Sequence, residues 1–170
     1  MFFVLFSISI ALTGCFFKGG VEVSEEISTE ALEIALRQQG KPYVWGGRGP
    51  DVFDCSGLIT WAYKSAVGRD RIFSISGYKT TDATMSDLYD WNVSLIPLEK
   101  AAPGDIIFFD EDDKITHGGL FIKWMDDSES EFEFVHASSA AGGVIVDSWI
   151  PGETRRKHSL TGAGRFKVAR

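Results

Sequence analysis

Apolar residues recur at helical spacing in two segments of the first half of the chain. The first segment predicts a helix over residues 29–39, with Ser28 as its N-cap and Gly40 as its stop. The second predicts a helix from about Cys55 to Val67, which follows a glycine-rich turn. This spacing places Cys55 at or near the N-terminus of a helix.

Short β-rich runs replace the helical pattern after residue 103. The preceding residues 69–97 show little periodicity, apart from a short helix expected around 82–89. Five strands are predicted, each bounded by Gly, Asp or Ser residues: 105–109, 117–124, 131–137, 144–147 and 165–168. Helices followed by an antiparallel meander, without βαβ alternation or internal repeats, indicate a single α+β domain.

The first residues form an almost unbroken apolar run, Met1 to Leu12, which is too short to span a bilayer but typical of a signal peptide. It ends in Leu12-Thr13-Gly14-Cys15, which resembles the bacterial lipobox, in which the cysteine is acylated. An ordinary signal peptide or a buried apolar helix is the alternative. We therefore expect a signal peptide over 1–14, a lipidated Cys15 and tether over 15–27, and the folded domain over 28–170.

Composition and charge narrow the classes of function. A chain of 170 residues with 44% hydrophobic residues and five tryptophans can bury the core of one domain. The formal net charge is −7, and the Lys and Arg residues are scattered. We do not expect the chain to bind nucleic acid, because binding to phosphate backbones needs a basic face. We expect a monomer.

Cys55 is the only cysteine besides Cys15, so in an exported chain with a lipidated Cys15 it has no disulfide partner. It is then either buried and inert or chemically reactive. A zinc site built from Cys55, His117, His136 and an Asp is an alternative, but the sequence has neither a CxxC nor an HExxH pair. We expect no metal and no cofactor.

Two of the three histidines fall on neighbouring predicted strands. A four-residue loop over 125–128 would pair Trp124 with Glu129 and would place His117 directly opposite His136. Directly opposed residues have Cβ atoms ~4.5–5.5 Å apart on one face of a sheet. A shift of two residues would leave the histidines diagonal, and a shift of one would put them on opposite faces.

These positions suit nucleophilic catalysis. A cysteine at a helix N-terminus gains thiolate character from the helix dipole and free N–H groups, and a neighbouring imidazole would complete an ion pair. Cys55, His117 and His136 have the residue types of a nucleophile, a base and a group that orients the base. The glycines at 46, 47 and 49 would let a substrate backbone approach N–H groups that could stabilise an oxyanion.

Five motifs in order resemble the NlpC/p60 cysteine peptidases, from about Ala31 to Arg170. They are Pro42-Tyr43-Val44-Trp45-Gly46-Gly47, Asp54-Cys55-Ser56-Gly57, Pro103-Gly104-Asp105, His117-Gly118-Gly119-Leu120-Phe121 and His136-Ala137-Ser138. The resemblance implies a papain-like core, with N-terminal helices packed on a mainly antiparallel sheet of five to six strands. It also implies endopeptidase action on peptidoglycan stem peptides or cross-links, with Cys55 as nucleophile, His117 as base and His136 orienting that base.

The same resemblance suggests roles for three residues near the thiol. Tyr43 would shape the oxyanion or substrate site, and Asp54 and Ser56 would line the pocket and could hold a substrate amine. Each has a structural alternative: Tyr43 as a core aromatic, Asp54 as a helix cap and Ser56 as an ordinary first-turn residue. For Asp54 the two roles are compatible.

The sequence also departs from the family pattern. Phe121 stands where the motif usually has Tyr, and residues 73–80 replace a Leu-Pro-Arg-like stretch of many relatives, so substrate specificity is the least determined property. No wall-binding repeat precedes the domain, and a lipid anchor could instead hold it at the membrane of the cell envelope. An amidase or acyltransferase of the same clan and a non-catalytic wall-binding lipoprotein stay as alternatives. His158, among Arg155, Arg156 and Lys157, is predicted to lie in a solvated loop that could touch anionic wall polymer.

Overall fold

The structure is a computed structural model that describes residues 20–170, so the predicted signal peptide and Cys15 lie outside the described residues. Its helices are α1 (Glu25–Leu36), α2 (Cys55–Val67), α3 (Met85–Trp91) and the short 3-10 helix η1 (Leu98–Lys100). Its strands are β1 (Val21–Glu22), β2 (Phe73–Ile75), β3 (Tyr78–Thr80), β4 (Val93–Ile96), β5 (Ile106–Glu111), β6 (Lys114–Trp124), β7 (Phe132–Ser138), β8 (Gly143–Trp149), β9 (Thr154–Arg155) and β10 (His158–Val168).

The two main helices follow the apolar pattern with one shift. Helix α2 has the predicted bounds, and Gly68 ends it with a left-handed φ of 70°. Helix α1 begins at Glu25 after Ser24, so the predicted cap Ser28 lies buried inside the helix. The acidic residues of its first turn favour this earlier start, because negative charge stabilises the positive end of a helix.

Helix α3 begins later than the predicted helix over 82–89. A capping box fixes its start, in which the Thr84 hydroxyl accepts from the Asp87 N–H and the Asp87 carboxylate accepts from the Thr84 N–H.

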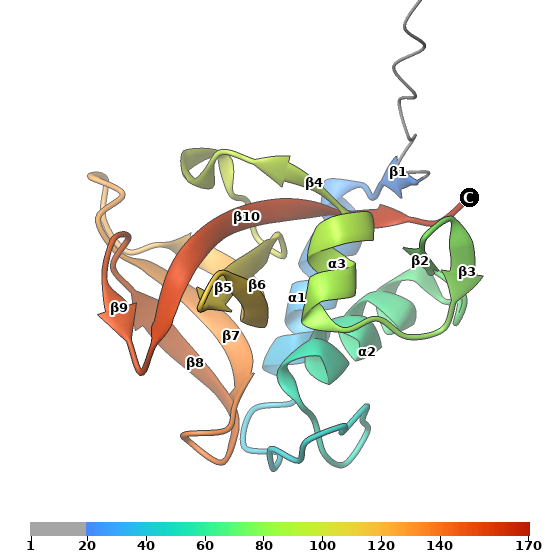
Figure 1. Cartoon of the computed structure of the whole chain (residues 1–170), viewed down its shortest axis with the longest axis horizontal. Coiled ribbons are helices and arrows are strands. Elements are labelled where there is room, and N and C mark those ends of the chain that lie inside the picture. The colour runs from blue at the N-terminus through green and yellow to red at the C-terminus, as the bar shows by residue number, and fades with distance from the viewer. Residues whose placement is uncertain (1–19) are drawn as a thin grey trace, which may run out of the picture.

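The main sheet contains the predicted antiparallel meander, and Figure 1 shows β10 crossing the molecule beside β5. Its strand order is β1-β10-β5-β6-β7-β8, and all these pairs are antiparallel. The short strands β4 and β9 also pair with β10, so the sheet has eight strands where five or six were expected. Only the end of β10 was predicted, because its first half is polar and rich in glycine.

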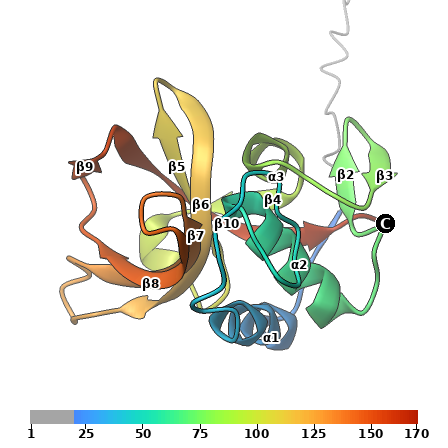
Figure 2. The same ribbon diagram turned by 90° about the horizontal axis from the view of Figure 1, so that it is seen from below.

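The three helices pack on one face of this sheet, and Figure 2 shows them on the opposite side of the molecule from β5, β8 and β9. The core between the helices and the sheet includes Leu58 and Ile59 of α2 with Phe108 and Val135 of the sheet. A second core lies on the other face, where the aromatic residues Phe109, Phe121, Phe132, Phe134 and Trp149 pack together. This arrangement confirms the α+β class and the helices-on-sheet architecture.

The register between β6 and β7 differs from the predicted one. Trp124 pairs with Phe132, and Phe121 pairs with Phe134, with a bulge between Phe121 and Lys123. The connecting loop covers 125–131 instead of 125–128, because the Asp126 carboxylate accepts hydrogen bonds from Ser128 and Ser130 and so organises a longer turn. Continuing this register places His136 opposite Gly119, diagonal to His117.

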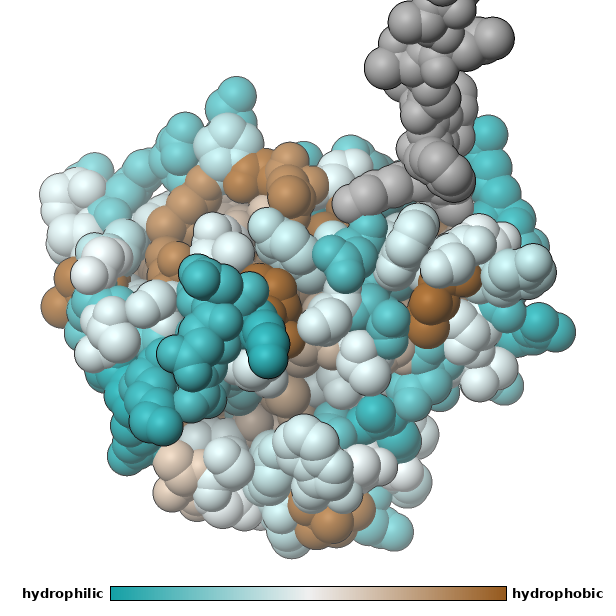
Figure 3. Space-filling view, in the orientation of Figure 1, coloured by the Kyte–Doolittle hydropathy of each residue, from teal (hydrophilic) through white to brown (hydrophobic). Residues whose placement is uncertain are grey.

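On the face seen in Figure 3, hydrophilic residues gather over the end of the β5–β6 hairpin. Within residues 20–170, no helix has the length and apolar character that a membrane span requires.

Candidate active site

Cys55 is the first residue of α2, and Asp54 caps this helix. The Asp54 Oδ1 atom accepts from the Gly57 N–H at 2.6 Å and from the Ser56 hydroxyl at 3.0 Å. Within the described part of the chain, the N–H groups of Cys55 and Ser56 donate to no other residue's oxygen. They are therefore free to stabilise negative charge beside the thiol.

The glycine-rich loop before α2 lies directly against the first turn of the helix. A Cβ atom at Gly57 would lie only 1.9 Å from the carbonyl oxygen of Gly47. Glycine at position 57 is thus what allows the loop to approach the helix so closely. This approach brings residues 43–48 to the same cavity as the thiol.

His117 and His136 form a direct hydrogen bond at the β6–β7 pair. His117 Nε2 lies 2.6 Å from His136 Nδ1, and the two rings are 4.9 Å apart at an interplanar angle of 72°. Gly119 makes this diagonal contact possible, because a Cβ there would lie 2.5 Å from the Val135 carbonyl oxygen and 3.0 Å from the His136 Cβ.

The thiol and the two imidazoles are brought to one place. Cys55 Sγ lies 3.8 Å from the carbonyl oxygen of Thr116, the neighbour of His117 in the chain. Cys55 and His117 line the same cavity, whose volume is ≈ 640 Å³. Because Nε2 of His117 is used by His136, its Nδ1 is the nitrogen that remains for the thiol.

That geometry implies one tautomer for each ring. To accept a proton at Nδ1, His117 must carry its own proton on Nε2 and donate it to His136 Nδ1. His136 then carries its proton on Nε2. This atom is buried without a hydrogen-bond partner among the described residues, and it lies 3.9 Å from Asp147 Oδ2.

Burial favours the neutral forms of both Cys55 and His117. It raises the pKa of Cys55 to about 11, with the charge of Asp54 adding to the shift, and the N–H groups of Ser56 and Cys55 and the charge of Arg48 only partly oppose this. Burial also lowers the pKa of His117 to about 3, helped by the charges of His136 and His158. Burial therefore opposes the thiolate–imidazolium ion pair that the helix N-terminus alone predicted.

The cavity around Cys55 also contains the three residues suggested near the thiol, Tyr43, Asp54 and Ser56. Burial raises the pKa of Tyr43, and the charges of Cys55 and Asp54 add to the shift, so its hydroxyl stays a hydrogen-bond donor. Trp45 is 86% exposed and lies at the rim of the same cavity.

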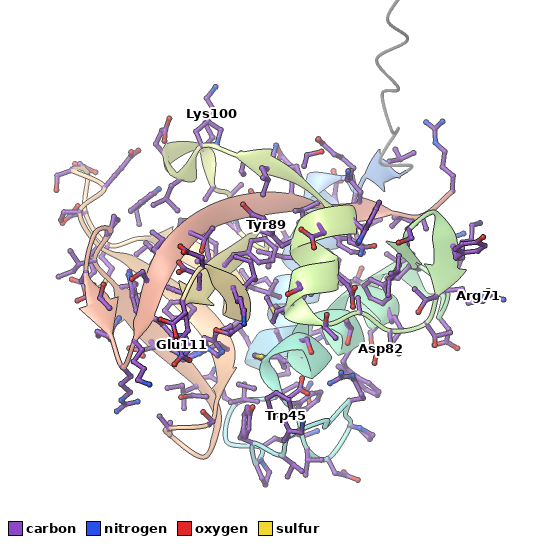
Figure 4. The ribbon with its side chains drawn as sticks, viewed as in Figure 1. Trp45, Arg71, Asp82, Tyr89, Lys100 and Glu111 are labelled. Carbon is purple, nitrogen blue, oxygen red and sulfur yellow. The ribbon has the colours of Figure 1, made fainter. Side chains whose placement is uncertain are left out.

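Asp54 has a further partner that the sequence did not suggest. Its Oδ2 atom accepts from the Gly46 N–H at 2.9 Å and from Arg48 Nη1 at 2.6 Å. Arg48 Nε also donates to Asp82 at 2.8 Å, and Figure 4 shows Asp82 and Trp45 on the same side of the molecule. The predicted helix-cap role of Asp54 is confirmed. The only signal for Arg48 in the sequence was its place in the glycine-rich turn, six residues before Asp54.

His158 does not lie in a solvated loop as predicted, because β9 and β10 form a hairpin that folds it back over the site. Its ring is 5.4 Å from that of His117, and its Nδ1 is 3.4 Å from the Thr116 hydroxyl. The half-buried His158 lines both the Cys55 cavity and a neighbouring cavity of ≈ 690 Å³ that reaches His136, Arg155 and Arg156.

The zinc alternative does not fit this geometry. Among residues 20–170, no three His, Cys, Asp or Glu side chains are grouped as ligands for a metal. His117 and His136 also point their nitrogens at each other at 2.6 Å, which leaves no room for an ion between them.

The chain is similar in sequence to known proteins. A model of the NlpC/P60 family matches residues 40–160. A Listeria grayi protein described as a probable endopeptidase p60 is 38% identical over 88 residues, which cover 52% of this chain and 15% of that protein. The probable endopeptidase Rv2190c of Mycobacterium tuberculosis is 33% identical over 95 residues, which cover 55% of this chain and 21% of that protein. The chain thus matches only about a fifth or less of the length of these relatives.

Solved structures show the same fold. NlpC1 from Trichomonas vaginalis superposes with a TM-score of 0.61 at 24% identity, covering 87% of this chain and 47% of that one. A Staphylococcus aureus protein described as similar to lipoprotein of the NLP/P60 family gives a TM-score of 0.57 at 28% identity, covering 86% and 43%. The NlpC/p60 domain of the peptidoglycan hydrolase SagA gives 0.53 at 25% identity, covering 71% and 88%.

Proposed function

Since this chain belongs to the NlpC/P60 family, we propose that it is a cysteine endopeptidase that cleaves peptide bonds in peptidoglycan stem peptides or their cross-links. The observation that carries the proposal is the geometry around Cys55. Cys55 is the first residue of helix α2, and His117 lines the same cavity as its thiol. His136 Nδ1 lies 2.6 Å from Nε2 of His117, the ring nitrogen that the thiol does not use. These are the parts that nucleophilic acyl transfer needs.

In the proposed first half-reaction, the Cys55 sulfur attacks the carbonyl carbon of the scissile bond while the thiol proton passes to His117 Nδ1. The N–H groups at the start of α2 and the Tyr43 hydroxyl stabilise the oxyanion that forms. The imidazolium then gives its proton to the leaving amine, and the C–N bond breaks to leave a thioester on Cys55.

In the second half-reaction, water attacks the thioester and gives a proton to His117, which returns it to the departing thiolate. His136 keeps its hydrogen bond to His117 Nε2 throughout, so the ring stays in the orientation that presents Nδ1 to the thiol. No metal or cofactor takes part in these steps.

We also propose that the protein works at the cell envelope as a monomer held by a lipid on Cys15. The support is the apolar run of residues 1–12 and the lipobox-like Leu12-Thr13-Gly14-Cys15. A Cys15→Ser form should lose acylation and leave the membrane fraction of the producing cell. A Cys15→Ser form that remains acylated would refute the lipobox interpretation.

The decisive test is mass spectrometry of purified peptidoglycan digested by the protein from Lys18 onward, with Cys55→Ala as the matched control. We expect fragments with a new amine within a stem peptide or at a cross-link, and none from the control. Cleavage of another acyl bond would indicate an amidase of the same clan. Thiol labelling of Cys55 without any cleavage would indicate a non-catalytic wall-binding protein.

A further inference from the structure

Arg48 lies in the Cys55 cavity and joins two carboxylates. Its Nη1 donates to Asp54 at 2.6 Å, and its Nε donates to Asp82 at 2.8 Å. The Asp54 side chain is 8% exposed, whereas that of Arg48 is 32% exposed. The guanidinium therefore covers a buried carboxylate directly beside the nucleophile.

All hydrogen-bonding positions of the Asp54 carboxylate are filled from within the protein. Oδ1 accepts from Ser56 and Gly57, and Oδ2 accepts from Gly46 and Arg48. A carboxylate offers about four lone-pair positions, so a substrate ammonium group could reach Asp54 only by displacing one of these donors. Of the two side-chain donors, Arg48 is the more exposed because Ser56 is buried, and displacing Arg48 would break its short, charge-assisted hydrogen bond.

Glu111, the other carboxylate that lines the cavity, has a cationic partner as well. Lys157 Nζ lies 3.5 Å from Glu111 Oε1. Among the lining residues that the structure describes, neither carboxylate is left without a positive partner. An incoming free amine would meet paired carboxylates and the positive charge of Arg48.

Arg48 does keep hydrogen-bonding capacity for a neutral group. Its Nη2 has no hydrogen-bond acceptor among residues 20–170, and the side chain is partly exposed where it lines the cavity. An amide carbonyl oxygen can accept from this atom without adding a charge. A peptide whose N-terminus is acylated presents such an oxygen, and a peptide with a free amine does not.

We propose that Arg48 is a specificity-determining residue that adapts the Cys55 cavity to stem peptides with an amide-blocked N-terminus over peptides with a free α-amine. The inference rests on the proposed endopeptidase function and names the substrate class of the same site. The expected substrates are therefore stem peptides that are still joined to the glycan, and not released peptides.

The experiment compares one synthetic stem peptide in two forms, with a free N-terminal amine and with an N-acetyl group, by their kcat/KM values. The wild-type protein should cleave the acetylated peptide with a higher kcat/KM than the free one. Arg48→Gln leaves Asp54 without its cation, so the preference should shift toward the free amine by on the order of fivefold or more. Arg48→Lys keeps the charge and should keep the preference for the acetylated peptide.

Arg37→Gln is the matched control, because it removes the same charge from an exposed residue that follows α1 and lies outside the cavity. It should leave the ratio of the two kcat/KM values unchanged. A wild-type preference for the free amine would overturn the inference while leaving the endopeptidase function intact, even if Arg48→Gln failed to fold. An unchanged ratio in folded Arg48→Gln would also overturn it. Cleavage of neither peptide would overturn the proposed function and this inference with it.

Discussion

His117 and His136 share a 2.6 Å hydrogen bond although they are not directly opposite each other in the sheet. The bond joins His117 Nε2 to His136 Nδ1, so His136 acts as an acceptor when His117 is ready to take a proton at Nδ1. The only atom that His136 needs for this role is therefore its Nδ1, which accepts the hydrogen bond from His117. An amide oxygen could supply the same contact, whereas a methyl group could not.

Substitution of the two histidines should therefore give a ranked series of rates. We expect wild type to be fastest, then His136→Asn, then His136→Ala, and His117→Ala to be slowest. Loss of His117 removes both the base and the proton donor for the leaving amine, which should lower kcat by about 10²–10⁴-fold. Steady-state hydrolysis of a stem-peptide substrate measures the series.

Circular dichroism of each variant is the control for folding. If His136→Ala were as inactive as His117→Ala and His136→Asn were no better, His136 would do more than orient the base.

Asp147 is expected to act only through His136. Its Oδ2 lies 3.9 Å from the buried Nε2 of His136, which favours the tautomer that carries its proton there. Asp147→Asn should lower kcat by roughly two- to tenfold with little change in KM, because weakening one supporting contact is worth ~0.5–1.5 kcal/mol. In a His136→Asn background the same change should have no further effect, since the group it supports is gone.

Kinetics of the single and double variants test this relationship. Equal losses from Asp147→Asn in both backgrounds would show that Asp147 does not work through His136. Asp147→Glu, which keeps a carboxylate, should recover part of the rate.

The pH dependence of alkylation should report the state of Cys55. Burial raises the pKa of its thiol to about 11, so the rate of reaction with iodoacetamide should keep rising from pH 6 to pH 10. The protein from Lys18 onward contains Cys55 as its single cysteine, and Cys55→Ala is the control for labelling elsewhere. Modification should also abolish hydrolysis.

A rate that is already constant between pH 5 and pH 9 would mean that the resting pair is a thiolate and an imidazolium. That outcome would mean that the helix N-terminus, and not burial, has the larger effect on the pKa of the Cys55 thiol.

The helices and strands that could be predicted are those in which apolar residues recur at a regular spacing. The apolar spacing of 55–67 predicted helix α2 with its observed bounds, and this placed Cys55 at the helix start. The meander of β5–β8 was also predicted, because each strand is a short β-rich run between turn residues. These features are local, so they can be inferred without knowing the rest of the fold.

The missed features depend on contacts between distant segments. The β6–β7 register was wrong because Asp126 builds a longer loop and a bulge follows Phe121, and neither changes the hydrophobic pattern. His158 was misplaced because the start of β10 gains its strand structure by pairing with β5 and β9. The bond between Arg48 and Asp82 spans 34 residues of sequence, which spacing cannot reveal.

The half-buried His117 and the buried His136 should make folding stability depend on pH. Burial lowers the pKa of His117 to about 3 and that of His136 to about 4, from 6.5. Between pH 6.5 and pH 4, the unfolded chain therefore binds protons that the folded chain does not bind, so the free energy of unfolding should fall as the pH falls. His136→Gln removes one of these titrating groups, and its free energy of unfolding should fall less over the same range.

Urea unfolding of both proteins at a series of pH values measures the two slopes, with Arg37→Gln as a surface control that should follow the wild type. Carboxylates elsewhere in the chain also bind protons in acid. These contribute equally to both proteins, so the difference between the curves reports the loss of His136 together with its effect on the pKa of His117. Parallel curves for wild type and His136→Gln would mean that His136 is protonated as readily in the folded protein as in the unfolded chain. The interpretation that burial keeps the histidines of the site neutral would then be wrong.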